Sequence, residues 1–197
     1  MGYTLIGAVR SRALRVLWTL EELGLDYEHI EAAPHSEAIR RVSPAGKVPV
    51  LVADGVALSD SVAIMTYLAD RHGALGFAPG TIARAQQDSL TNLILDEFDA
   101  ALWTAARHSF VLPEEHRLPA IKDSLQWEFA RSQGHMVSRM DADGPFLMGD
   151  TLTIADILLA HCCGWAANAK FPILEPRLKD HMAMMRARPS YARALNR

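Results

Sequence analysis

The sequence changes its periodicity near residue 75, and this change restricts the possible folds more than any other feature. Before that point, short apolar runs alternate with amphipathic helical stripes. These patterns predict strands at 3–6 and 26–31, a pair of strands within 48–58, and helices at 13–24, 36–42 and 59–72. After GALGFAPG, residues 73–80, only helical patterns follow.

The order of the early elements predicts how they are arranged. Strand, helix, strand, helix, two strands and helix suit a small sheet with a parallel first pair and an antiparallel edge. Asp54 and Gly55 suit the turn between the last two strands. We therefore predict an α/β thioredoxin-like N-terminal domain over 1–73, a linker over 74–80 and an all-α C-terminal domain over 81–197.

The second half is predicted to begin with two long helices, over 82–108 and 114–140. A later helix has a clear start signal, with Thr153 as the N-cap and Asp156 three residues further on. This pair is typical of a capping box, and Leu152 is placed to pack against Ile157. Such a start usually serves folding.

The composition is that of a globular protein, with half of the 197 residues apolar and 22% charged. The formal net charge of -3 argues against a nucleic-acid partner, because a polyanion requires a basic surface. The first ten residues lack the apolar core of a secretion signal, and no apolar run approaches the about 20 residues of a membrane span. We expect a cytoplasmic protein with no membrane partner.

The two cysteines, Cys162 and Cys163, are adjacent within a predicted helix. Their side chains would point about 100° apart, so a disulfide is not expected. Together with His161 they cannot converge on one ion without further ligands, so no metal site is expected either.

Five segments resemble those of the soluble glutathione transferase family, in the same order and at the same spacings. The opening segment is similar to serine-type members, close to the phi-like and many bacterial forms. The segments are GAVRSRALRVLWTLEELGLDYE, SPAGKVPVL, LSDSVAIMTYLADRHG, GDTLTIADILLAH and ARPSYARAL. The resemblance covers nearly the whole chain and implies glutathione as the co-substrate.

Pro49 follows Val48 where the pattern predicts a strand, and proline removes one donor of the hydrogen-bond ladder. The residues alone also fit an edge-strand proline without a ligand. The resemblance implies a cis Val48–Pro49 bond and a Val48 backbone that pairs with the cysteinyl unit of glutathione.

Asp60 and Ser61 begin a predicted helix, where free amides and the helix dipole favour an anion. An ordinary N-cap accounts for the same residues. The resemblance assigns both to the glutamyl end of glutathione, with Asp60 in place of the glutamate that family members usually have.

Lys47 and His35 match family positions that meet the glycyl carboxylate, although either residue would also fit as a solvated surface side chain. Arg10 and Arg15 would add to a positive field around the same cleft. Such a field would attract glutathione, which is anionic at neutral pH.

Ser11 lies between the first predicted strand and helix, so it would serve either as a cap or as a catalytic group. A free thiol with a pKa of about 8.5 is only a few per cent thiolate at pH 7. A hydroxyl at a helix N-terminus can stabilise the thiolate, and the resemblance implies this role for Ser11. Tyr3 stands several residues from this loop, which argues against a tyrosine-type site.

The second substrate is expected to be a small apolar electrophile. Aromatic residues at helical spacing are more often core than site. The residues expected to line its pocket are Arg10, Phe98, Trp103, Phe110 and Trp165.

The functional hypothesis is conjugation of glutathione to small apolar electrophiles. Two alternatives stay open: glutathione-dependent isomerisation or peroxide reduction at the same site, and a non-catalytic binding or assembly module. The family also implies a homodimer.

Overall fold

The computed structural model describes residues 2–197, and the chain divides into two compact units. The first unit contains the residues up to Pro79 together with Arg186–Arg197, and the second is Gly80–Met185. The predicted domain limits stay a prediction. The compact units differ from them at the C-terminal end, since the last twelve residues, 186–197, belong to the first unit.

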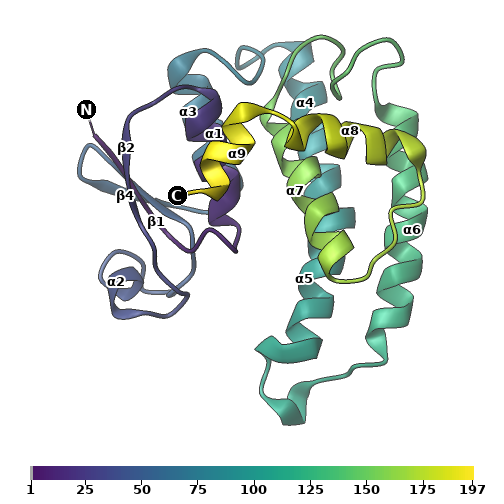
Figure 1. Cartoon of the computed structure of the whole chain (residues 1–197), viewed down its shortest axis with the longest axis horizontal. Helices are drawn as coiled ribbons and strands as arrows, with labels where there is room; N and C mark the ends of the chain where they lie inside the picture. Colours follow the sequence, from purple (N-terminus) through teal and green to yellow (C-terminus); the bar gives the residue numbers. More distant parts are fainter. Residues whose placement is uncertain (1) are drawn as a thin grey trace. The chain divides into compact units, whose positions relative to one another are not determined.

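The first unit is built on a four-stranded mixed sheet with the strand order β2-β1-β3-β4 (Figure 1). The parallel pair is β1 (Tyr3–Ile6) with β2 (Tyr27–Ile30). The antiparallel strands are β3 (Val50–Ala53), which pairs with β1, and β4 (Val56–Ser59), which pairs with β3. The predicted thioredoxin-like topology is thereby confirmed.

Apolar residues cover both faces of this sheet. Ile6 and Val50 are register partners, and they cluster with Ile39 of the short helix α2 (Glu37–Arg40). Leu5 and Leu51 are the next pair along and point to the opposite face, because side chains alternate along a strand. Both leucines are fully buried as well, so the sheet is a central layer.

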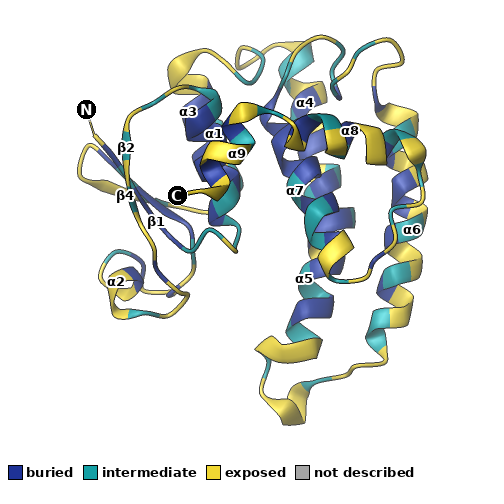
Figure 2. Cartoon of the chain, viewed as in Figure 1, coloured by how far each residue is buried: buried dark blue, intermediate teal, exposed yellow. Residues whose placement is uncertain are grey.

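The remaining helices of the first unit are α1 (Ala13–Glu22), α3 (Ser61–His72) and α9 (Pro189–Leu195). Helix α1 packs against both α3 and α9. It buries one side chain after another, Val16, Leu17, Trp18 and Leu20 among them, and Figure 2 shows most of it in the colour of buried residues. The helix therefore forms the centre of the unit beside the sheet.

The second unit begins with a continuous helical run. It consists of α4 (Ile82–Leu93), a π-helical segment (Ile94–Asp99), α5 (Ala100–Ala106) and a second π-helical segment (Arg107–Val111). The predicted helix over 82–108 is present, but its π-helical turns were not predicted. Such turns are often found at functional sites.

A short 3-10 helix (Glu114–His116) follows, and then three α-helices: α6 (Ile121–Arg139), α7 (Ile154–Asn168) and α8 (Pro176–Arg186). The helix predicted to begin at residue 114 starts seven residues later. Pro119 explains the delay, because it lacks an amide donor and disfavours the helical conformation of the residue before it.

The predicted capping box at the start of α7 is present. The Thr153 amide and hydroxyl both donate to Asp156 Oδ2, each at 2.8 Å. Within residues 2–197, no helix has the length and apolar character needed to cross a lipid bilayer.

Candidate functional site

The predicted glutathione-binding segments meet at one end of the sheet. Ile6 is the register partner of Val50, and Val50 is the partner of Ser59. Residues directly beyond these three positions therefore lie next to one another. They belong to the loop that leads to Ser11, to the Val48–Pro49 segment and to the start of α3.

Gly7 brings the first two of these segments into close contact. A Cβ atom at this glycine would lie 2.9 Å from Ala13 Cβ, 3.3 Å from Val48 Cβ and 3.4 Å from Pro49 Cα. A side chain would therefore force apart the start of α1 and the proline segment. Glycine is needed here because the two backbones approach so closely.

The Ser11 hydroxyl makes two hydrogen bonds at the start of α1. Its Oγ donates to the Ala8 carbonyl at 2.6 Å and accepts from the Ala13 amide at 3.0 Å. Arg12 occupies the N-cap position, so Ser11 lies one residue before it. The hydroxyl still satisfies one amide of the first helical turn, as a cap does.

The Val48–Pro49 peptide bond is cis. Val48 lies before the first residue of β3, beyond the last register pair of the ladder. The backbone of Val48 is therefore outside the sheet, at the end where Ser11 and Ser61 also lie.

Asp60 caps α3 with its side chain. Its Oδ1 accepts from the Val62 amide at 2.9 Å and from the Ala63 amide at 3.0 Å, and its backbone has a φ of 74°. Two of the amides expected to meet an anion are thus already bound by this carboxylate. The anion-binding capacity left at this helix start is smaller than the sequence suggests.

Ser61 and Arg15 form a buried link between α1 and α3. The side chains of both are buried, and Arg15 Nη1 donates to Ser61 Oγ at 3.3 Å. From the sequence we expected Arg15 to contribute to the positive field around the cleft. Its side chain is instead buried, so Arg15 is an internal charge that links α1 to the start of α3.

His35 and Lys47 are brought near each other by a tight turn. The His35 amide donates to the Gly46 carbonyl at 2.7 Å, one residue before Lys47. A Cβ at Gly46 would lie 2.4 Å from His35 Nδ1, so the imidazole packs directly on this glycine. Both side chains are exposed.

The residues predicted to line the acceptor pocket belong to both units, Arg10 to the first and the others to the second. Phe98 is fully buried and its ring contacts Phe129, with 5.1 Å between the centroids. This corrects the expectation for Phe98, because a ring enclosed in the core has no surface to offer a substrate. Trp103 and Trp165 are half-buried and Phe110 is exposed, so their role stays a prediction.

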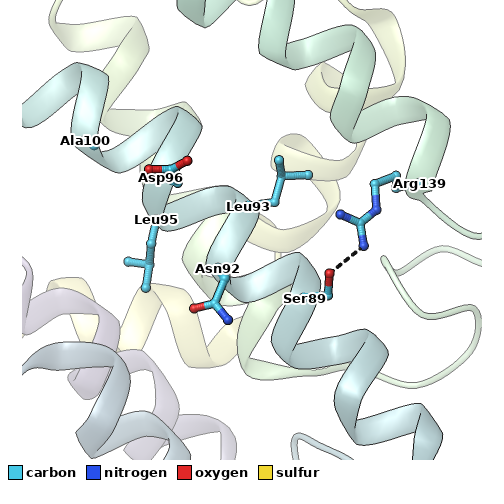
Figure 3. Close-up of a pocket in the computed structure, with 7 residues that line it drawn as sticks. All are labelled: Ser89, Asn92, Leu93, Leu95, Asp96, Ala100 and Arg139. Carbon is cyan, nitrogen blue, oxygen red and sulfur yellow. Dashed lines mark hydrogen bonds between the residues drawn. The ribbon is translucent and has the colours of Figure 1, made fainter.

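A hollow within the second unit lies between α4, the first π-helical segment and the end of α6 (Figure 3). Arg139 Nη2 reaches across it and donates to Ser89 Oγ at 2.8 Å. The residues that line it are Ser89, Asn92, Leu93, Leu95, Asp96, Ala100 and Arg139. None of the predicted acceptor residues is among them.

A second, more polar hollow adjoins the first and shares Asp96 and Ala100 with it. Glu97 lies in this hollow, and its pKa is held below the ordinary value. The largest cause is a hydrogen bond with Ser132, and a smaller one is a hydrogen bond with His135, while burial acts in the opposite direction. The predicted acceptor residues do not line this hollow either.

The cysteines are placed as core residues. Cys162 and Cys163 are free and buried, and burial raises the pKa of the Cys163 thiol. A thiol of this kind is a poor nucleophile. Among the residues that the structure describes, no group of three or more His, Cys, Asp or Glu side chains is placed to hold a metal ion.

Sequence reasoning missed two side chains that contact the Ser11 loop. His29 Nε2 lies 2.8 Å from the Gly7 carbonyl, and the Val9 amide donates to Glu31 Oε2 at 3.1 Å. His29 belongs to β2, and Glu31 directly follows the last residue of that strand. Parallel pairing of β1 with β2 places their ends side by side, and this is the signal that could have found them.

Comparison with known proteins identifies similar chains. The family model described as "Glutathione S-transferase, N-terminal domain" matches residues 5–76. Probable glutathione S-transferase 7 from Caenorhabditis elegans is 30% identical over 167 residues, which are 80% of this chain and 77% of that protein.

Solved structures extend the similarity to nearly the whole chain. A glutathione transferase from Methylococcus capsulatus is 26% identical with a TM-score of 0.83, and the match covers 98% of this chain and 97% of that one. BphK, a bacterial GST solved as a ternary complex, is 25% identical with a TM-score of 0.86, and the match covers 98% of each chain.

Proposed function

The chain belongs to the glutathione S-transferase family, and from this premise we propose that it transfers glutathione, as the thiolate, to small apolar electrophiles. The observation that carries the proposal is the position of the Ser11 hydroxyl. It lies at the start of α1, at the same end of the sheet as Val48 and Ser61.

The proposed binding mode uses three parts of the first unit. The Val48 backbone pairs with the cysteinyl unit, and Lys47, with His35 beside it, meets the glycyl carboxylate. Ser61 receives the glutamyl α-carboxylate at the start of α3, where the helix dipole favours an anion.

Asp60 has a separate task in this mode. The Val62 and Ala63 amides both bind its Oδ1, so Oδ2 can accept from the glutamyl ammonium. The carboxylate is already held by the helix start and needs no rearrangement. Preorganisation of this kind reduces the entropic cost of binding.

Ser11 is proposed to stabilise the thiolate. Lowering the thiol pKa by about two units requires about 2.7 kcal/mol of preferential stabilisation. A charge-assisted hydrogen bond from a hydroxyl, together with the positive end of α1, can provide this amount. These features support a serine-type site.

The hydroxyl has to change its partner for this task. Ser11 Oγ has one proton, and it points to the Ala8 carbonyl in the free protein. Rotation about the Cβ–Oγ bond would turn the same proton toward the sulfur, while Oγ still accepts from the Ala13 amide. The Ala8 carbonyl is then the acceptor that competes with the thiolate.

In the proposed reaction the thiolate attacks an electrophilic carbon. A carbon–sulfur bond forms, and the leaving group departs with the electron pair of the broken bond. Buried Cys162 and Cys163 take no part. A homodimer in the cytoplasm belongs to the same proposal, on family grounds.

The experiment is calorimetric titration with glutathione, followed by steady-state conjugation of an aryl halide. Ser11→Ala should lower the conjugation rate by at least about tenfold, a loss of about 1.4 kcal/mol of transition-state stabilisation, with glutathione still bound. Ser124→Ala, an exposed serine on α6, is the matched control. Full activity of Ser11→Ala contradicts the role of Ser11, and absence of glutathione binding contradicts the proposed function.

A further inference from the structure

The segment that leads to Ser11 is tied to the end of β2 on both sides of Ala8. Before Ala8, Gly7 has two bonds: its amide donates to the Ile30 carbonyl at 3.0 Å, and its carbonyl lies 2.8 Å from His29 Nε2. After Ala8, the Val9 amide donates to Glu31 Oε2 at 3.1 Å. The Ala8 peptide is thereby held between two anchored neighbours.

The chemistry of the His29 contact determines where its proton lies. A carbonyl oxygen only accepts, so Nε2 carries the hydrogen and donates it to Gly7. The side chain of His29 is 9% exposed, so few water molecules compete for this bond. Glu31 is mostly exposed, with its Oε2 3.7 Å from the same Nε2.

The peptide held in this way contains the partner of Ser11. The Ala8 carbonyl accepts the Ser11 hydroxyl proton at 2.6 Å. Its distance from Ser11 Oγ decides how strongly it competes with a sulfur anion for that proton. A carbonyl that shifts with a loose loop would also shift the hydroxyl.

We propose that His29 and Glu31 are positioning residues for Ser11. They fix the position of the Ala8 carbonyl, which holds the Ser11 hydroxyl proton in the free protein. From that position the hydroxyl can turn and donate to the thiolate of bound glutathione. The inference rests on the proposed function for its catalytic consequence, but its structural part concerns the free protein. Neither residue touches the reacting atoms.

The structural part is tested by amide hydrogen exchange in the protein without glutathione. The reporter is the Ala13 amide, which donates its hydrogen bond to Ser11 Oγ and not to a positioning residue. His29→Phe and Glu31→Ala should speed its exchange by at least about tenfold, because local opening becomes easier. His29→Gln and Glu31→Gln keep a donor and an acceptor, and should restore slow exchange.

Glu28→Ala is the matched control. Glu28 is an exposed glutamate of β2, and it accepts a hydrogen bond from Thr4 and not from the loop. It should leave the Ala13 exchange rate unchanged. Unchanged exchange in both His29→Phe and Glu31→Ala overturns the inference, whether or not the protein binds glutathione.

The catalytic part is tested by the ultraviolet absorbance of bound glutathione thiolate, titrated with pH. Glu31→Ala and His29→Phe should raise the apparent pKa of the bound thiol and lower kcat, with a smaller change in the KM for glutathione. Removal of a negative charge alone would favour the thiolate, so Glu31→Gln should not raise that pKa.

A raised pKa in Glu31→Ala is therefore assigned to the lost hydrogen bond and supports the inference. An unchanged thiol pKa in both disruptive variants overturns it. If the unmodified protein binds no glutathione, the proposed function fails, and Ala13 exchange alone decides whether His29 and Glu31 position the loop.

Discussion

Arg188, the N-cap residue of α9, forms a two-pronged ion pair with Glu22 of α1, with Nε 2.6 Å from Oε1 and Nη2 2.9 Å from Oε2. Trp18 Nε1 and Ser190 Oγ also donate to Oε1. The ring of Trp18 lies against that of Tyr191, with 4.6 Å between the centroids. The end of the chain is thus fixed to the helix that begins beside Ser11.

Arg188→Ala should therefore destabilise the protein by about 2–3 kcal/mol. Glu22 is largely buried, and the loss of its partner leaves a carboxylate with fewer bonds in a poorly solvated place. Arg41→Ala is the matched control, because its pair with Glu37 is exposed and should contribute less than about 1 kcal/mol. Urea unfolding measures both, and equal losses would contradict this account.

The neighbouring Glu21 makes stability depend on pH. Burial opposes its ionisation, but hydrogen bonds from Arg193, Tyr27 and Arg197 outweigh this effect and hold the pKa of Glu21 below its ordinary value. Such a carboxylate adds stability above its unfolded pKa of about 4.3 and loses it as the pH falls through the lower folded pKa.

The measurement is the free energy of unfolding of the unmodified protein and of Glu21→Gln at a series of pH values. At neutral pH the unmodified protein should be the more stable of the two. The difference should shrink as the pH falls below about 4.3, because protonation removes the same charge that the substitution removes. If the free energies of unfolding of the two proteins changed in parallel with pH, the ionisation of Glu21 would not be linked to folding.

Much of the first unit could be predicted from local sequence signals. The strands, the turn at Asp54 and the helix starts all follow from apolar periodicity and turn residues, which depend on near neighbours. The convergence of Ser11, Val48 and Ser61 also follows, once the strand order is known. These features are local or depend on topology alone.

Long-range contacts could not be predicted in the same way. The position of α9 depends on charged residues that pair over more than 160 positions, and a single sequence does not say which arginine meets which glutamate. Phe98 has the same limitation, because helical spacing alone favours the core for an aromatic residue but does not exclude a pocket. His29 carries no local signal of its contact with Gly7, because a histidine within a strand usually packs against its neighbours without a functional role.

Two glycines should respond to alanine in opposite ways. Gly7→Ala would place Cβ 2.9 Å from Ala13 Cβ and close to Val48, so it should cost about 1–3 kcal/mol and weaken glutathione binding. Gly134→Ala lies within α6 with no atom within 4 Å of the new Cβ, and should stabilise by about 0.5–1 kcal/mol. Thermal unfolding separates the two, and a neutral Gly7→Ala would contradict the close contact.

In the second unit, the fully buried Asp156 joins three separate segments. Its Oδ1 accepts from the Leu147 amide at 2.8 Å and lies 3.0 Å from His181 Nε2. Its Oδ2 accepts from both the amide and the hydroxyl of Thr153. The imidazole of His181 is buried as well. The start of α7, the preceding loop and α8 therefore depend on one carboxylate.

Asp156→Ala should destabilise the protein by about 3–5 kcal/mol, because it leaves several buried donors without an acceptor. Thr153→Val removes the capping hydroxyl but keeps the Thr153 amide bond to Asp156, and should cost about 1 kcal/mol. His181→Gln keeps a donor toward Asp156 and should fall between the two. Denaturant unfolding measures all three variants. A loss below about 0.5 kcal/mol in Asp156→Ala would show that the three segments hold together without this carboxylate, since ordinary surface substitutions have effects of that size.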